Sequence, residues 1–394
     1  MWVPMAALSA RLTLSAVTGA GALCILGPRV VRRKECSEAL RRALSDSRPQ
    51  PLPSPVESSP VHRCRLEHKR YITSRKLAGI LALLLQEKQN TPQVVLECNP
   101  GPGILTQALL ETGARVIALE SERTFIPHLE SLGKQHHGKL DVVHCDFFKM
   151  DPQNSGLVKP PVVLSQTLFH DLEIEGFPWS AGIPLKVFGI FPMKNEKKAL
   201  WKLIYSLYSC TSIYRYGRVE LNMFISEKEY QKLMAKPTDG NLYQVLSVLW
   251  QVACNIRLLH MEPWSSFDLY TQNGQLHKIK SKELAELIQQ NLYFVQMTPR
   301  KALFTENLTP VNYEVFFHML KQCFVKRNAN LVDHLHSLSP VDAMDLLSKI
   351  RKHKNMKITN MYPLDFKRLF EAVECSRGYT YKWLCNDIIE DKIM

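Results

Sequence analysis

Hydrophobic and polar positions follow two regular patterns in the stretch from residue 94 to residue 120. Val94–Leu96 is a short apolar run, residues 104–111 have the three-to-four spacing of a helix, and Arg115–Leu119 is apolar again. Gly113 stands where that helix should end. The order of strand, helix and strand predicts a βαβ unit, and a further apolar run at 140–145 predicts a third strand.

The loop between the first predicted strand and its helix reads ECNPGPG and has glycines at 101 and 103. Glycines in such a loop let the backbone approach a ligand closely. An acid after the next strand, here Glu120, can accept both ribose hydroxyls of an adenosine-containing cofactor. Asp146 could accept the adenine amino group while Phe147 packs against the ring. The alternative is a loop that only turns the chain and an Asp that caps a helix.

The third glycine of the dinucleotide fingerprint is absent from this loop, which disfavours NAD and favours S-adenosylmethionine. The ten cysteines form no C-x-x-C pair, and no His/Cys cluster has metal spacing. We therefore predict free thiols in a reducing compartment and no metal site.

Charge along the chain suggests a polyanionic partner. The formal net charge of the 394 residues is +13, from 50 basic and 37 acidic residues. Residues 1–45 hold seven basic and two acidic residues, so most of the excess lies in the remainder. A basic body favours nucleic acid as a partner, and a basic but inert surface is the alternative.

The first 45 residues have the composition of a mitochondrial transit peptide. No acid precedes Glu35, and Lys and Arg are interleaved with Leu, Ala and Ser. A secretory signal is the alternative, because Ala16–Leu26 is fairly apolar, but basic residues continue after that run. The run is also shorter than the ~20 residues that span a bilayer, so no membrane partner is expected.

Pro and Ser are frequent in residues 46–65, which predicts a flexible linker. Two further parts are then expected: a methyltransferase-like cofactor-binding domain at 66–300, and a C-terminal helical domain with an acidic aromatic tail at 301–394.

On its motifs the chain resembles the RNA adenine-N6 dimethyltransferases that modify small-subunit ribosomal RNA. Their first motif reads L-E-I-G-P-G-x-G-x-L-T, and residues 96–106 read LECNPGPGILT. Tyr71-Ile72 stands where the family has Phe-Leu over the cofactor, preceded by Lys69 and Arg70 in place of two polar residues. The LMAKPTDGNLYQVLSVLWQ segment from Leu233 is similar to a later family motif.

This resemblance implies an α/β fold, a doubly wound Rossmann-like sheet of the S-adenosylmethionine-dependent methyltransferase type with a smaller C-terminal helical domain. The cofactor-binding residues that it implies are Ile72, Glu97, Gly101, Gly103, Glu120 and Asp146.

The segment KVFGIFPMK departs from the family at the substrate site. The family's fourth strand ends in Gly-Asn-Leu-Pro followed by Tyr or Phe. In that family the Asn oxygen and a neighbouring backbone carbonyl accept the N6 hydrogens of a flipped adenine. The Tyr or Phe ring stacks on the base. Here the sequence is Gly189-Ile190-Phe191-Pro192-Met193. Isoleucine accepts no hydrogen bond, and losing one such contact costs about 10²–10³ in rate.

The catalytic motif is therefore degenerate at Ile190, Pro192 and Met193. Two hypotheses follow: a slow methyltransferase, or a fold reused to bind nucleic acid with residual methyl transfer. We favour the second.

A weaker signal for nucleic-acid binding lies near the C-terminus. The family reads F-x-x-R-R-K-x-L where this chain has Phe324 to Leu331, and this predicts phosphate contacts for Lys326 and Arg327. Residues 318–370 hold ten basic residues against four Asp. A solvated helix edge is the alternative reading.

The leader, the cofactor motifs and the altered Asn motif together are similar to the mitochondrial transcription factors B, a branch of this family. That resemblance implies a nucleoid-associated protein of the mitochondrial matrix. Its implied partners are the mitochondrial RNA polymerase, promoter DNA and a high-mobility-group promoter factor, with mitochondrial small-subunit rRNA as a secondary target. The alternative is a fully active mitochondrial small-subunit rRNA adenine-N6,N6-dimethyltransferase. A small-molecule methyltransferase is disfavoured by the basic body.

Overall fold

The computed structural model describes residues 69–86, 94–136, 138–152, 162–270, 290–338 and 343–375. All of them belong to one compact unit, residues 65–394. The predicted transit peptide and the predicted linker lie outside the described residues, and so does the part of the predicted acidic tail that follows Cys375. A division of the compact unit at residue 300 remains a prediction.

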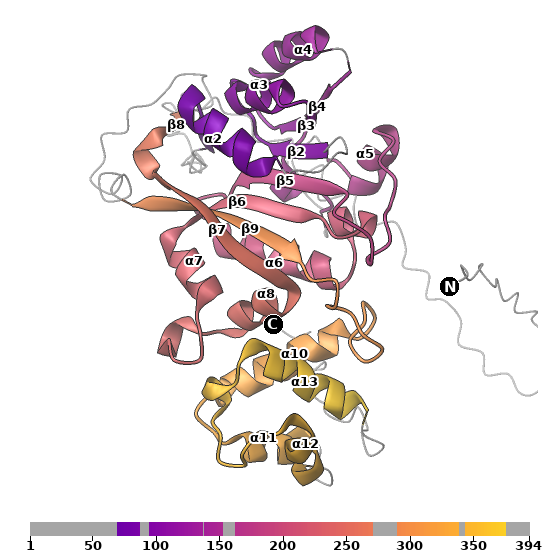
Figure 1. Ribbon diagram of the computed structural model, residues 1–394, viewed down its shortest axis with the longest axis vertical. Helices are drawn as coiled ribbons and strands as arrows, with labels where there is room; N and C mark the ends of the chain where they lie inside the picture. The colour runs from indigo at the N-terminus through magenta and orange to yellow at the C-terminus, as the bar shows by residue number, and fades with distance from the viewer. Residues whose placement is uncertain are drawn as a thin grey trace, which may run out of the picture. The chain divides into compact units, whose positions relative to one another are not determined.

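A seven-stranded mixed sheet forms the centre of the described part of the chain, in the order β4-β3-β2-β5-β6-β9-β7 (Figure 1). Neighbouring strands are parallel from β4 to β6, and β9 runs antiparallel to both β6 and β7. The strand bounds are β2 Val94–Cys98, β3 Arg115–Glu120, β4 Leu140–His144, β5 Leu185–Ile190, β6 Glu220–Ser226, β7 Cys254–Pro263 and β9 Asn291–Pro299. The expected α/β sheet is confirmed.

Alternating side chains divide each central strand between two apolar cores. Val95, Val116 and Ala118 pack with α2 (Arg75–Leu85) and α3 (Ile104–Glu111). Leu96 and Ile117 point to the opposite face, which α6 (Glu196–Tyr208) and α8 (Val245–Ala253) cover. Because successive residues of a strand face opposite sides, a continuous apolar run indicates a strand that is buried on both faces.

The remaining elements flank the sheet. A separate two-stranded ribbon pairs β1 (Lys69–Ile72) with β8 (Phe267–Tyr270). Among the described residues before 300, the other α-helices are α4 Ile126–Gln135, α5 Ser165–Asp171 and α7 Glu227–Met234. No helix among the described ranges is long and apolar enough to cross a bilayer.

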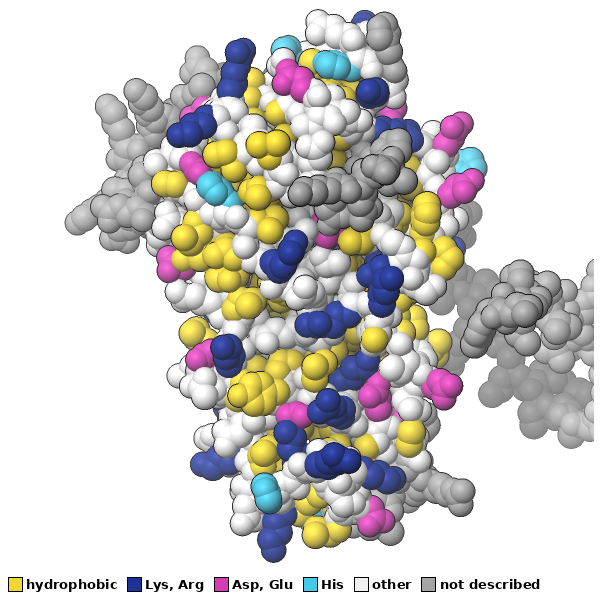
Figure 2. Space-filling model, viewed as in Figure 1, with side chains coloured by type: hydrophobic (Ala, Val, Ile, Leu, Met, Phe, Trp, Pro, Cys, Tyr) yellow, Lys and Arg dark blue, Asp and Glu magenta, His cyan; other side chains and the backbone are white. Residues whose placement is uncertain are grey.

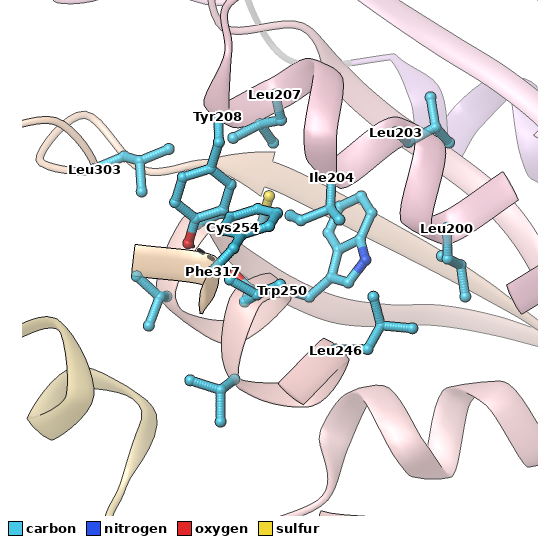
Figure 3. Packing of buried hydrophobic residues seen from close by; sticks show 14 of the residues in the cluster. Leu200, Leu203, Ile204, Leu207, Tyr208, Leu246, Trp250, Cys254, Leu303 and Phe317 are labelled. Atoms are coloured by element: carbon cyan, nitrogen blue, oxygen red, sulfur yellow. Dashed lines mark hydrogen bonds between the residues drawn. The ribbon is translucent and has the colours of Figure 1, made fainter. Parts of the chain in front are cut away.

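Within the described residues, four α-helices follow β9: α10 Tyr313–Val325, α11 Leu331–Leu338, α12 Ala343–Ile350 and α13 Pro363–Glu374. Their apolar side chains belong to the same core as α6 and α8. Figure 3 shows the junction, where Tyr208 of α6 meets Phe317 of α10 edge to face at 4.9 Å between ring centroids. The spacing of Tyr313, Phe316 and Phe317 thus marks a core face.

The C-terminal helical domain is predicted from residue 301, but its first α-helix among the described residues, α10, begins at Tyr313. Side chains of Thr305 and Asn312 accept hydrogen bonds from the backbone N–H groups of Leu308 and Thr309, at 3.1 and 2.8 Å. Such local side-chain to backbone bonds compete with a helix, and they hold the preceding ten residues in turns.

Because one core joins the sheet to the C-terminal helices, Phe316→Ala should destabilise both together. Phe316 is fully buried between Tyr208 and Phe370, so the cavity should cost about 3–5 kcal/mol of unfolding free energy. Urea unfolding followed by circular dichroism and tryptophan fluorescence measures it. Val325→Ala, at an exposed position of the same helix, should cost less than about 0.5 kcal/mol. Two separated transitions in the Phe316 variant would show that the helices unfold independently.

Candidate cofactor and substrate site

The glycine loop after β2 is built from residues with left-handed backbone. Asn99, Gly101 and Gly103 have φ of 51°, 62° and 75°. Asn is among the few residues other than Gly that enter this region readily, which explains its presence where the family motif has a glycine. A Cβ atom on Gly101 would lie 2.2 Å from Cδ1 of Tyr71, so the loop requires glycine there.

Glu120 ends β3 and lies beside that loop, as predicted. Its two carboxylate oxygens accept hydrogen bonds from the backbone N–H groups of Gly101 at 2.8 Å and Glu122 at 2.7 Å. The side chain is fully buried, and this burial raises the pKa of Glu120. Each oxygen of an ionised carboxylate has a second lone pair, so ribose hydroxyls could still donate to it.

Glu97 lies within β2 and is also buried. It accepts a hydrogen bond of 2.7 Å from the Thr106 hydroxyl, and burial raises the pKa of Glu97 to about 8. This contact links the strand to the first turn of α3 and so fixes both ends of the glycine loop. A direct cofactor contact for Glu97 remains a prediction.

Asp146 follows β4 and caps a short 3₁₀ helix, residues Phe147–Lys149. One of its oxygens accepts from the Phe148 N–H at 3.1 Å, and the other lies 3.0 Å from the Lys149 ammonium. Phe147, for which an adenine contact is predicted, is buried in the core, and its neighbour Phe148 is only partly buried. Phe148 lies 5.4 Å from the Phe191 ring, between centroids.

The predicted substrate motif lies at the carboxyl end of β5. Ile190 is the last residue of that strand, and it packs with Met193 against the apolar core under α2 and α3. Gly189 passes close to β2, where an added Cβ would lie 3.0 Å from Cβ of Cys98. The motif therefore offers aliphatic side chains, and no amide, at positions 190 and 193.

A basic strand, β1, which the sequence pattern did not predict, crosses this region. In β1, Lys69 donates to the Ser121 hydroxyl at 2.6 Å and to the Glu122 carboxylate at 2.7 Å, next to Glu120. Arg70 donates to the Phe191 carbonyl at 2.7 Å. The sequence feature that could have indicated this strand is the pair Lys69 and Arg70, which stands where the family has two polar residues. Ile72, from the same strand, is buried in the core of α2 and α3.

Lys326 and Arg327 lie just after α10, and their surroundings differ. Lys326 is exposed, whereas the Arg327 guanidinium donates to the Gly240 carbonyl at 2.5 Å and the Tyr243 carbonyl at 3.4 Å. Figure 2 shows Lys and Arg side chains gathered over the C-terminal helices, in the lower part of the view. The basic residues exposed over the described C-terminal helices and their connections are Lys321, Lys326, Lys349, Arg351, Lys354, Lys357 and Arg368.

Within the described ranges, no group of three or more His, Cys, Asp or Glu side chains could hold a metal ion. The described cysteines are free thiols, at positions 98, 145, 210, 254, 323 and 375.

Comparison with known proteins assigns this site to a family. Residues 69–374 match the family described as ribosomal RNA adenine dimethylase. The chain is 56% identical to the Homo sapiens protein "Dimethyladenosine transferase 2, mitochondrial", with 100% of each chain covered. It is 54% identical to the Mus musculus protein of that name, with 98% of each chain covered. The solved structure of the 23S rRNA methyltransferase ErmE has 17% identity and a TM-score of 0.48, covering 77% of this chain and 98% of that one.

The family match spans most of the chain, and it includes the glycine loop, both acids and the altered substrate motif. This protein belongs to the ribosomal RNA adenine dimethylase family.

Proposed function

We propose that this protein is a mitochondrial transcription initiation factor, a counterpart of the second mammalian paralogue of mitochondrial transcription factor B. It acts with the mitochondrial RNA polymerase in promoter melting and initiation, alongside a high-mobility-group promoter factor. It keeps an S-adenosylmethionine-binding fold and transfers methyl groups to rRNA adenine weakly. The observation that carries the proposal is the aliphatic Ile190 at the end of β5.

Cofactor binding is supported by the residue types around the glycine loop. Glu120 ends β3 and Asp146 follows β4, and these two neighbouring parallel strands bring their carboxyl ends to one edge of the sheet. The carboxylates suit the ribose hydroxyls and the adenine amino group, and the loop between β2 and α3 suits the amino-acid part of the cofactor. Bound there, S-adenosylmethionine would supply the methyl group.

Weak methyl transfer is supported by the chemistry of the strand end. An adenine amine must be held by acceptors so that its nitrogen lone pair faces the methyl carbon. Ile190 supplies no acceptor, and Met193 supplies no ring face for stacking. Removing one polar contact of this kind lowers a rate by about 10²–10³.

A mitochondrial location is supported by the leader composition and by the relatives, which are named as mitochondrial proteins. Matrix and nucleoid placement follows from the proposed partners. The polymerase, promoter and promoter-factor partners rest on the resemblance to transcription factors B. The exposed basic residues of the C-terminal helices are compatible with promoter DNA or with rRNA.

One prediction concerns these basic residues. Lys326→Ala should lower the slope of log affinity against log salt for DNA by about 0.9, because one phosphate contact is lost. Fluorescence anisotropy with a promoter duplex at several salt concentrations measures it. Lys134→Ala, at the exposed end of α4, serves as the control and should leave the slope unchanged. Arg327 is less suitable for this test. Its guanidinium donates to a backbone carbonyl, so a substitution would also remove a hydrogen bond that stabilises the fold. Identical slopes for both lysine variants would remove Lys326 from the interface.

Two assays test the proposal against the enzyme alternative. Reconstituted transcription with the polymerase and the promoter factor should depend on this protein. Primer extension on mitochondrial small-subunit rRNA from depleted cells should show little loss of adenine dimethylation. Full dependence of rRNA dimethylation on the protein, with transcription unaffected, would establish the active dimethyltransferase instead.

A further inference from the structure

Arg70 is a buried cation at the edge of the substrate motif. Only 7% of its surface is exposed, and its guanidinium lies 5.9 Å from the centroid of the Trp264 ring. Burying a charge is costly unless hydrogen bonds or opposite charges compensate it. The Glu196 carboxylate attracts it through space, but that carboxylate accepts hydrogen bonds from the N–H and hydroxyl of Ser226, at 2.6 and 2.5 Å.

The hydrogen bond of Arg70 is made instead to a main-chain carbonyl, that of Phe191, at 2.7 Å. Phe191 follows the last residue of β5, and its N–H still donates to the Phe224 carbonyl of β6 at 3.0 Å. Pro192 comes next and lacks an N–H, so the backbone leaves the sheet there. The Phe191 carbonyl therefore lies where the strand end meets the site, beside an Ile190 side chain that accepts nothing.

β1 holds Arg70 in this place through several other contacts. It pairs with β8 along four residues, from Lys69 with Tyr270 to Ile72 with Phe267. The Thr73 hydroxyl donates to the Asp268 carboxylate at 2.5 Å, and Lys69 forms an ion pair with Glu122 at 2.7 Å. The paired strands β1 and β8 thus hold the guanidinium in place, and Arg70 is a buried side chain.

A guanidinium and an adenine amino group present the same feature to a carbonyl, a planar nitrogen with N–H bonds. The guanidinium is charged and forms the stronger bond. The carbonyl oxygen has two lone pairs, so a base that enters the site must displace the guanidinium or share the oxygen with it. Sharing weakens the bond to the base, because the charged donor already draws electron density from that oxygen.

We propose that Arg70 acts as an internal occupant of the amine site, holding the Phe191 carbonyl that an incoming adenine would otherwise use. This inference rests on the proposed function, which assigns the end of β5 as the adenine site. Two acceptors are then withdrawn from the base: one by the aliphatic side chain of Ile190, the other by the guanidinium of Arg70.

The experiment measures base capture directly, without methyl transfer. The probe is an rRNA hairpin with 2-aminopurine beside the target adenine, so that the target keeps its N6 amine and the probe fluorescence rises when that adenine leaves the stack. The full chain is compared as Ile190→Asn and as Ile190→Asn with Arg70→Met. Methionine has a similar length and no N–H donor. We expect the second protein to capture the base at least about tenfold more tightly, because the carbonyl becomes available.

Arg218→Met in the Ile190→Asn background is the matched control. Arg218 is as buried as Arg70, and its guanidinium also donates to backbone carbonyls, those of Trp179 at 2.9 Å and Pro299 at 3.2 Å, away from the β5 end. It should lower the melting temperature without improving base capture. Arg70 does not contact S-adenosylmethionine in this proposal. An unchanged affinity for S-adenosylmethionine therefore shows that a variant is folded.

Equal base capture by the folded Arg70→Met and Arg70 proteins would overturn the inference. The same gain from Arg218→Met would also overturn it, since general loosening would then explain the result. Both outcomes leave the proposed function standing. The proposed function fails on a separate measurement, brisk methylation of the hairpin by the unaltered chain.

Discussion

Asp146→Asn combined with Glu120→Ala should abolish measurable S-adenosylmethionine binding and leave promoter-dependent transcription intact. Each carboxylate is expected to accept hydrogen bonds from the cofactor, and a hydrogen bond to a charged group contributes about 1.5–3 kcal/mol. Each substitution should therefore weaken binding by roughly 10- to 100-fold. Isothermal titration with S-adenosylmethionine and reconstituted transcription with the polymerase measure the two effects.

The structure makes Asp146→Asn the cleaner of the two substitutions. Asparagine keeps an oxygen for the Phe148 N–H, so the cap of the 3₁₀ helix survives. Its amide nitrogen replaces the oxygen beside Lys149 and presents a donor to the adenine amino group. Glu120→Ala also leaves the N–H groups of Gly101 and Glu122 without their carboxylate. Its loss of binding should thus be accompanied by lower stability, which thermal unfolding reports.

Loss of transcription in the folded Asp146→Asn protein would link cofactor binding to the polymerase function. In that case the proposed separation of the two roles is wrong, and an enzyme becomes the better description.

Ile190→Asn with Met193→Phe should raise adenine methylation, and adding Arg70→Met should raise it further. The amide restores one acceptor, the ring restores a stacking face, and the third change frees the Phe191 carbonyl. The three changes together should increase the rate by about 10²–10³. Transfer of labelled methyl groups from S-adenosylmethionine to an rRNA hairpin measures the rate.

Ile190→Leu with Met193→Phe provides the matched control, because leucine has the same size and accepts no hydrogen bond. It should gain only what the stacking ring contributes, so its rate should stay well below that of the protein with Ile190→Asn and Met193→Phe. Adding Asp146→Asn to the restored protein should return the rate to background, which shows that the gain depends on the cofactor site. A restored protein that binds the cofactor and still shows no gain would mean that another feature closes the site.

Much of the fold was predictable from local pattern. The apolar runs at 94–96, 115–119 and 140–145 became β2, β3 and β4, and the helix at 104–111 has the predicted bounds. The strands are buried on both faces and the helix on one face, so the hydrophobic pattern of each element is clear in the sequence. The start of the C-terminal helices was predicted poorly, because Thr305 and Asn312 bind nearby backbone groups that a helix would use.

The sequence alone determined the chemistry available at each strand end: glycines after β2, an acid at the end of β3, an acid after β4 and an isoleucine at the end of β5. Residue type and strand order are enough for that, because parallel strands bring their carboxyl ends to one edge. Tertiary structure alone decided that Arg70 holds the Phe191 carbonyl, 121 residues away, that Phe147 turns into the core, and that Arg327 binds the backbone of residues 240 and 243. The periodicity within a segment shows which of its faces is buried. It does not show which residues of a distant segment pack against that face, because this depends on the arrangement of the sheet and helices.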